Sequence, residues 1–190
     1  MTRENKKIEI LKAAGSIFSK KGFHGAKMED IAKTAGIGKG TVYGYFESKE
    51  VLFYELIRYG MEEYKNGMGK AFMGKGLVRD KIIRLCRYHG EFLIKYIDIA
   101  QIVINQQETL KVEFKQEIIR EKISLYHMME DVLREGQASG EIRNDLDVEL
   151  GTLVIVGAIS QFYGKRIFYD KVKYSDISPE AMVEILFQGL

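Results

Sequence analysis

The sequence predicts an all-α protein of about nine helices. Apolar residues recur at steps of three and four along most of the 190-residue chain, which is the spacing of one helix face. Pro179 is the single proline, so long helices are permitted almost everywhere, and no segment shows a convincing strand pattern. We expect a three-helix domain at residues 1–50 and a larger helical domain at residues 51–190.

The first helix is expected from Lys6 to Lys21. Its apolar stripe consists of Ile8, Leu11, Ala14, Gly15 and Phe18. Gly22 ends it, after Lys20 and Lys21 have placed positive charge at the negative end of the helix dipole.

Two short helices follow, at about Met28 to Ala35 and Lys39 to Phe46, separated by a Gly-Ile-Gly turn. This order is typical of a helix-turn-helix, in which the second helix enters the major groove of DNA. The residues expected to hold the two helices together are Ile31, Ala32, Ala35, Ile37, Val42 and Phe46. Lysine, threonine and tyrosine side chains remain for the outer face, where they can contact phosphates and base edges.

The charge distribution agrees with a DNA-binding N-terminus. Residues 1–50 contain ten Lys/Arg and six Asp/Glu, a net charge of +4, whereas the remainder contains 19 and 21, a net charge of −2. A basic module on a slightly acidic body attracts phosphate at one end only.

The sequence argues against an enzyme, a metal site and a membrane protein. The run Gly36 to Thr41 has neither the spacing of a Walker loop nor the preceding strand of a dinucleotide loop. The three histidines form no spaced ligand pair, and Cys86 is the only cysteine, so we expect no metal, no disulfide and no cofactor. The longest apolar stretch, 153–159, is too short to span a bilayer, and no signal-peptide pattern is present, so a cytoplasmic location is expected.

The sequence predicts a series of helices for the larger domain. A fourth helix starts at Ser48 and continues to about Asn66, and four glycines, Gly67, Gly69, Gly74 and Gly76, indicate a flexible connection after it. Further helices are expected at about 78–96, 97–108 and 111–138, the last ended by Ser139-Gly140.

The last two helices are expected at 148–169 and 178–190. The first is apolar on nearly all sides, so we expect it to be buried, with Asp147 as its N-cap. The second opens with Ser178 as a hydroxyl N-cap and Pro179 at the first helical position. Either helix could belong to a monomer core, but a dimer is favoured because one recognition helix reads too little DNA. The interface candidates are Gly157, Ser160, Gly164, Met182, Ile185 and Leu186.

Residues 8–56 resemble the DNA-binding domain of TetR/AcrR-type transcriptional regulators. The matching positions are Ile31-Ala32, Ala35-Gly36-Ile37, Gly40-Thr41-Val42-Tyr43, Tyr45-Phe46 and Ser48-Lys49-Glu50. The resemblance implies DNA contacts by Lys27, Met28, Gly38, Lys39, Gly40, Thr41, Tyr43, Tyr45 and Lys49. Two departures are Gly38, where the family often has serine, and Ala26-Lys27, where it often has hydroxyl residues.

The same resemblance implies an effector cavity in the larger domain, for an apolar or aromatic small molecule. The candidate lining residues are Tyr88, Phe92, Tyr96, Gln106, Phe114, Tyr126, Met129 and Phe162, although most could simply be core. The sequence therefore predicts a homodimeric, ligand-responsive repressor of a palindromic operator. The alternative is a helical interaction module whose basic N-terminal helices bind a protein partner.

Overall fold

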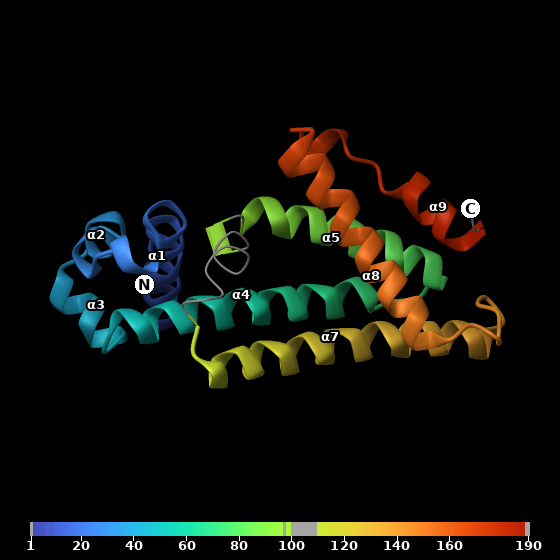
Figure 1. Cartoon of the computed structure of the whole chain (residues 1–190), viewed down its shortest axis with the longest axis horizontal. Helices are drawn as coiled ribbons and strands as arrows, with labels where there is room; N and C mark the ends of the chain where they lie inside the picture. The colour runs from blue at the N-terminus through green and yellow to red at the C-terminus, as the bar shows by residue number, and fades with distance from the viewer. Residues whose placement is uncertain (1, 97, 100–109, 189–190) are drawn as a thin grey trace. The chain divides into compact units, whose positions relative to one another are not determined.

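The computed structural model describes residues 2–96, 98–99 and 110–188, which contain eight α-helices (Figure 1). The prediction of an all-α fold is confirmed. None of the helices within these residues is long and apolar enough to cross a membrane. The chain packs into two compact units, Met1–Glu63 with Tyr96–Glu117, and Tyr64–Lys95 with Ile118–Leu190. The domain boundary after residue 50 stays a prediction, since these units are defined by packing.

The first unit contains α1 (Arg3–Gly25), α2 (Met28–Thr34), α3 (Lys39–Tyr45) and the beginning of α4 (Lys49–Phe72) (Figure 1). Its fully buried side chains include Ile10, Phe18, Ile31, Val42, Phe46, Leu52 and Leu56. The helical geometry of α1 breaks at Gly22, whose φ is 68°, and one further turn follows. The stop predicted at Gly22 therefore marks a kink.

The turn between α2 and α3 is a Schellman motif centred on Gly36. The amide of Ile37 donates to the carbonyl of Ala32 at 3.0 Å, and the amide of Gly36 donates to that of Lys33 at 3.2 Å. Gly36 has a φ of 66°, which glycine adopts at little cost. The prediction of Gly36 as the turn residue is confirmed, and the turn sets the angle between the two helices.

The connection after α4 differs from the prediction. Gly67 and Gly69 lie inside α4, which continues to Phe72, so the expectation of a flexible connection there is wrong. A Cβ at Gly67 would overlap the ring of Tyr88, which shows that this glycine makes room for α5. Gly74 and Gly76 follow the helix and have positive φ angles, as a loop allows.

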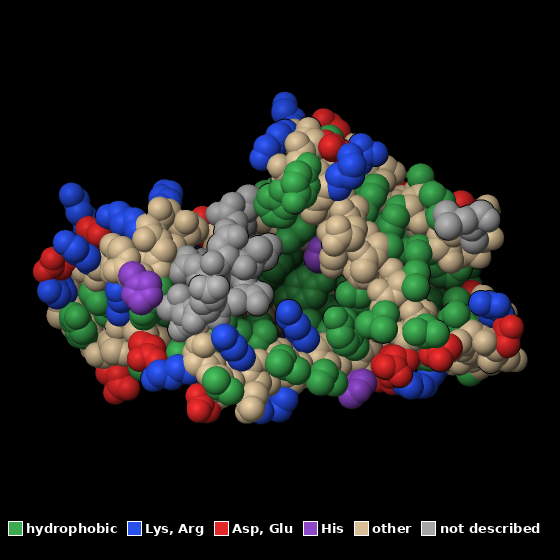
Figure 2. All heavy atoms as spheres, in the orientation of Figure 1, with side chains coloured by type: hydrophobic (Ala, Val, Ile, Leu, Met, Phe, Trp, Pro, Cys, Tyr) green, Lys and Arg blue, Asp and Glu red, His purple; other side chains and the backbone are tan. Residues whose placement is uncertain are grey.

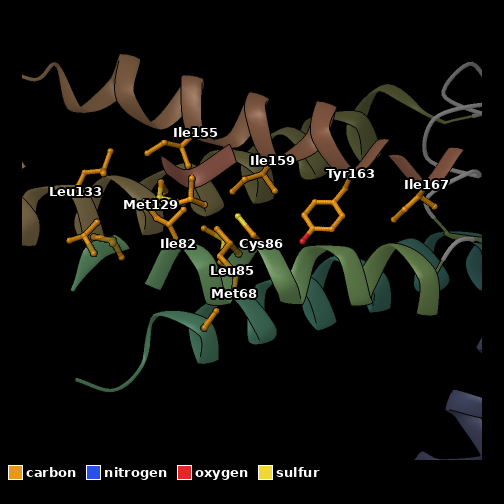
Figure 3. Packing of buried hydrophobic residues seen from close by; sticks show 14 residues of the cluster. Met68, Ile82, Leu85, Cys86, Met129, Leu133, Ile155, Ile159, Tyr163 and Ile167 are labelled. Atoms are coloured by element: carbon orange, nitrogen blue, oxygen red, sulfur yellow. The ribbon is translucent and has the colours of Figure 1, made fainter. Parts of the chain in front are cut away.

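The second unit contains α5 (Val78–Lys95), α8 (Val148–Gly164), α9 (Glu180–Gln188), the end of α4 and most of α7 (Val112–Ser139). Figure 3 shows its core, in which side chains of α4, α5, α7 and α8 interdigitate. A π-helical turn at Lys165–Tyr169 extends α8, and a short 3₁₀ helix lies at Tyr174–Asp176. The helix expected at 97–108 lies almost entirely outside the described residues.

The surface of α8 departs from the expectation of a fully buried helix. Asp147 caps its start as predicted, accepting a hydrogen bond from the amide of Leu150 at 3.0 Å. Only one face is covered, however, and Leu150 and Val154 are each 60% exposed. At the start of α9 the prediction also fails in detail, because the helix begins at Glu180 and the Ser178 hydroxyl donates to the Glu180 carboxylate. Exposed apolar surface of this kind is typical of an interaction site.

Candidate DNA-binding surface and effector cavity

The outer face of the helix-turn-helix carries most of the predicted DNA-binding side chains. Lys39, Thr41 and Tyr43 are exposed on α3, while Val42 between them is fully buried. Gly38 and Gly40 are also exposed, and a Cβ at Gly40 would meet no atom within 4 Å. The first turn of α3 is therefore open to close approach by another molecule.

The start of α2 is divided between surface and core. Lys27 is exposed at its N-cap position. Met28, in contrast, is 6% exposed and packs in the core, so only its main chain remains for the DNA contact predicted from the sequence. Met28 lies at the start of a helix, but its side chain is apolar and therefore packs into the core.

Lys39 is paired within the protein. Its Nζ donates to Oε1 of Glu29 at 2.7 Å, and this pairing raises the pKa of Lys39 and lowers that of Glu29. Both side chains are more than half exposed, so water and salt weaken the pair. The pair is therefore weak, and a contact of Lys39 with a DNA phosphate stays a prediction.

Lys49 has a different environment. Its Nζ donates to the carbonyls of Phe23, His24 and Ala26, at 2.7, 3.3 and 3.0 Å, and lies 4.6 Å from the centre of the Phe23 ring. All three donors of an ammonium group are thus directed at the C-terminal end of α1. This geometry makes Lys49 a cap of α1, and its contact to a DNA phosphate stays a prediction.

Tyr45 is half-buried, and the guanidinium of Arg3 lies 5.8 Å from the centre of its ring. This distance is within the range of a cation–π contact. The basic N-terminus of α1 therefore lies beside the end of α3.

Three contacts fasten the beginning of α7 to α4 within the first unit. Lys111 pairs with Glu50 at 2.7 Å, the ring of Phe114 stacks on that of Tyr54 at 4.2 Å, and Glu117 binds Arg58. The last pair is bidentate, with N–O distances of 2.6 and 2.8 Å. We call this set the α4–α7 ladder. It holds α7 to the helix that follows the recognition helix.

The second unit contains a cavity of about 280 Å³ between α4, α5, α7 and α8. Its apolar lining residues are Met68, Leu85, Leu125, Val156 and Ile159, and its polar ones are Tyr64, His89, Lys122, Tyr126 and Ser160. Figure 2 shows hydrophobic side chains in the hollow beside α8. Most of the surface of the walls is apolar, and such a surface with placed polar groups is typical of a small-molecule site. The volume is close to the lower end of the usual range.

His89 is the central polar group of this cavity. Its Nδ1 lies 2.8 Å from the hydroxyl of Tyr64, and the rings of Tyr64 and Tyr163 pack against it. Burial lowers the pKa of His89 to about 4 and raises that of Tyr64. Both groups are therefore uncharged at neutral pH.

Two family models match this chain. The model for bacterial regulatory proteins of the tetR family covers residues 10–56, and the model for a tetracyclin-repressor-like C-terminal domain covers residues 75–164. The chain belongs to the TetR family. It is a TetR-family transcriptional repressor with a DNA-binding helix-turn-helix and a ligand-binding domain, and it is not an enzyme.

Relatives of this TetR-family chain include regulators of lipid metabolism. The fatty acid metabolism regulator protein of Bacillus subtilis is 26% identical over 97% of this chain and 95% of the relative. The crystal structure of the regulator FadR from Bacillus subtilis in complex with stearoyl-CoA covers 96% of this chain and 98% of that one, with a TM-score of 0.77 and 25% identity. FadR from Bacillus halodurans, 22% identical, has the same fold over all of this chain and 98% of its own, with a TM-score of 0.82.

Of the pocket residues predicted from the sequence, the TetR-family cavity includes only Tyr126. Met129 is buried in the core, and Tyr88, Phe92 and Phe162 pack in ring clusters of the same unit. Two further candidates, Tyr96 and Phe114, belong to the first unit, and Gln106 lies outside the described residues. Sequence reasoning missed Tyr64 and His89. A polar pair 25 residues apart gives no local signal, so only the packing of α4 on α5 could reveal it.

A larger hollow of about 820 Å³ lies near the turn between α7 and α8, and exposed loop residues such as Arg143 and Asp145 form part of its lining. Cys86 is fully buried, and burial raises the pKa of its thiol to about 12, so it packs as a small hydrophobic residue. Among the described residues, no group of three His, Cys, Asp or Glu could hold a metal ion.

The predicted interface residues lie on or near the uncovered face of α8 and on α9. A Cβ at Gly157 or Gly164 would meet no atom within 4 Å, and Ile185 is 53% exposed. Met182 and Leu186 are half-buried against the core, whereas Ser160 is exposed and also lines the cavity. A dimer contact at these positions stays a prediction.

Proposed function

We propose that this TetR-family repressor is a cytoplasmic homodimer that binds a palindromic operator and releases it on binding a long-chain acyl-CoA. The observation that carries the proposal is an apolar cavity with a neutral polar pair, in a chain similar over nearly its whole length to a fatty acid metabolism regulator. The relative in complex with stearoyl-CoA supports the same class of effector.

Each protomer would place α3 in the major groove of one half-site. In this arrangement Lys39 and Tyr43 contact phosphates, and Thr41 contacts base edges through its hydroxyl and methyl groups. Two-fold symmetry then places two recognition helices about 34–36 Å apart on one side of the DNA.

The dimer would form through α8 and α9. Leu150, Leu153 and Val154 are 47–60% exposed in the single chain, next to the open small-residue positions Gly157 and Gly164. Packing of two such faces removes apolar surface from water and lets helices approach closely. A monomeric mass in sedimentation at micromolar concentration would contradict this arrangement.

Release of DNA is a shift in population between two body conformations. α7 is one continuous helix that carries the cavity residue Leu125 and, nearer its start, Phe114 and Glu117 of the α4–α7 ladder. A ligand that displaces α7 would therefore displace α4 beside the recognition helix. Coupling of about 1–3 kcal/mol changes DNA affinity by a factor of about 5–150.

The test is fluorescence anisotropy of labelled DNA from upstream of the protein's own gene. Stearoyl-CoA should release this DNA, whereas free coenzyme A at the same concentration should not. A Leu125→Trp variant, which fills the cavity, should bind DNA but no longer respond, and Ile123→Trp, at an exposed position of α7 outside the cavity lining, is the matched control. Unchanged DNA affinity at all acyl-CoA chain lengths would reject the effector class.

A further inference from the structure

The polar pair in the cavity allows a more specific statement about the effector, which rests on the function proposed above. His89 is on α5 and Tyr64 on α4, and their side chains meet inside the second unit at 2.8 Å. The other ring nitrogen of His89, Nε2, has no hydrogen-bond partner among the described residues. Since His89 lines the cavity, Nε2 is the ring atom left for a ligand.

The tautomer of His89 follows from its partner. A phenol is more acidic than a neutral imidazole, so in the favoured arrangement Tyr64 donates its hydroxyl proton to Nδ1 of His89. The proton of the neutral ring then resides on Nε2. The cavity therefore offers a hydrogen-bond donor, which needs an acceptor on the ligand.

The charge of the site limits which acceptor it takes. His89 and Tyr64 are uncharged, and Tyr126 and Ser160 supply only hydroxyl groups. Lys122 is the only charged side chain among the lining residues, and it is exposed. An ionised carboxylate placed at His89 would lose its hydration without gaining a buried cation. The free energy of removing an uncharged carbonyl from water is far smaller.

We propose that Nε2–H of His89 donates a hydrogen bond to the uncharged thioester carbonyl of the effector, and that the cavity thereby selects the acyl thioester over the free fatty acid. Tyr64 is a positioning residue, because it holds the donor tautomer of His89. The apolar residues of α4, α5, α7 and α8 then surround part of the acyl chain.

The proposal is tested with a pair of ligands that differ only at this carbonyl. Stearoyl-CoA has the thioester oxygen, and S-octadecyl-CoA is a thioether with a methylene group in its place. Calorimetry on the full-length protein should show that the thioester binds about 3- to 10-fold more tightly, as expected for one hydrogen bond. His89→Phe should reduce this preference to near unity, and Tyr64→Phe should reduce it in part.

The control is His127→Phe, which removes an exposed histidine of α7 outside the cavity lining and should keep the full preference. A full preference in His89→Phe would overturn the assignment of His89 while leaving the acyl-CoA effector intact. Failure of wild-type protein to bind any acyl-CoA would instead overturn the proposed function, and the inference with it. Stearate binding as tightly as stearoyl-CoA at pH 8 would also overturn the selectivity.

A second measurement does not depend on the folding of a variant. Stearoyl-CoA labelled with ¹³C at the thioester carbon shows a carbonyl stretch in isotope-edited infrared spectra. In complex with the wild-type protein this band should lie at lower frequency than in an aprotic solvent, because a hydrogen bond weakens the carbonyl bond. A band at the aprotic-solvent frequency would overturn the proposal.

Discussion

The helix-turn-helix and the effector cavity each contain a pair of interacting polar side chains, but one pair is exposed to water and the other is buried. Lys39 and Glu29 form their pair in water, with both side chains more than half exposed. Tyr64 and His89 form theirs inside the second unit, where burial shifts both pKa values away from the charged forms. In the proposed function the exposed pair exchanges Glu29 for a DNA phosphate, whereas the buried pair keeps its geometry and takes an uncharged partner.

The same comparison applies to the glycines of the two regions. Gly40 and Gly44 in α3 have open space where a Cβ would stand, but Gly90 in α5 lies under the rings of Tyr163 and Tyr174. The absence of neighbouring atoms around Gly40 and Gly44 leaves room for DNA to approach the recognition helix. The absence of a side chain at Gly90 lets two aromatic rings pack against the α5 backbone. Gly40 and Gly44 of α3 therefore tolerate a side chain that Gly90 of α5 does not.

The largest expected effect concerns the protonation of His89. Its pKa is about 4 in the folded protein and 6.5 without the fold, so the unfolded chain binds more protons between these values. The free energy of unfolding should therefore fall as pH decreases from 6.5 to 4, by about 3 kcal/mol in total. Urea denaturation at several pH values measures it, and His89→Gln should remove this contribution. His127→Gln, at an exposed position of α7, is the control for replacing a histidine by glutamine.

Gly90→Ala should lower the free energy of unfolding by about 1–3 kcal/mol, because a methyl group there would overlap the Tyr163 and Tyr174 rings. Gly44→Ala, on the open face of α3, is the matched control and should raise it by about 0.5–1 kcal/mol. Urea denaturation of both variants at pH 7 tests the contrast between the two regions. Equal effects of the two substitutions would contradict it.

Lys49→Met should destabilise the protein by about 1–2 kcal/mol, since three carbonyls at the end of α1 lose a charged donor. Its methylene groups, and thus its packing on Phe23, are largely kept. The slope of log DNA affinity against log salt should not change, because this ammonium is occupied within the protein. Lys39→Met should show the opposite result, with little loss of stability and a slope reduced by about 1. A reduced slope for Lys49→Met would show that Lys49 contacts a DNA phosphate, as the sequence predicts.

The smallest effect is expected for Glu29→Gln. Removing this carboxylate frees Lys39 for a phosphate, so affinity should rise by about two- to fivefold on specific and random DNA alike. Anisotropy titrations at low and high salt measure the gain, which should shrink as salt increases. Weaker binding would show that Glu29 positions Lys39 for DNA and does not compete for it.

Sequence reasoning succeeded where structure depends on neighbours along the chain. The Schellman turn at Gly36, the Asp147 cap of α8 and the stop at Gly140 each involve residues within about five positions, so residue type and spacing were enough. It failed where a distant segment decides. α4 continues through Gly67, where the ring of Tyr88 occupies the space of a side chain, and Lys49 donates to the Phe23 carbonyl across 26 residues of sequence.

The sequence by itself determined that the chain is all-α, that its N-terminus is a helix-turn-helix, and which side chains of α3 face outward. Those properties follow from helical periodicity and from backbone angles that only a few residue types adopt. The tertiary structure alone decided which of many aromatic and polar residues line the cavity. It also decided that burial favours neutral His89, with one ring nitrogen unpaired among the residues that the structure describes. Helix phase cannot supply this result, because the lining of a cavity and the dielectric around a histidine depend on how four separate helices pack together.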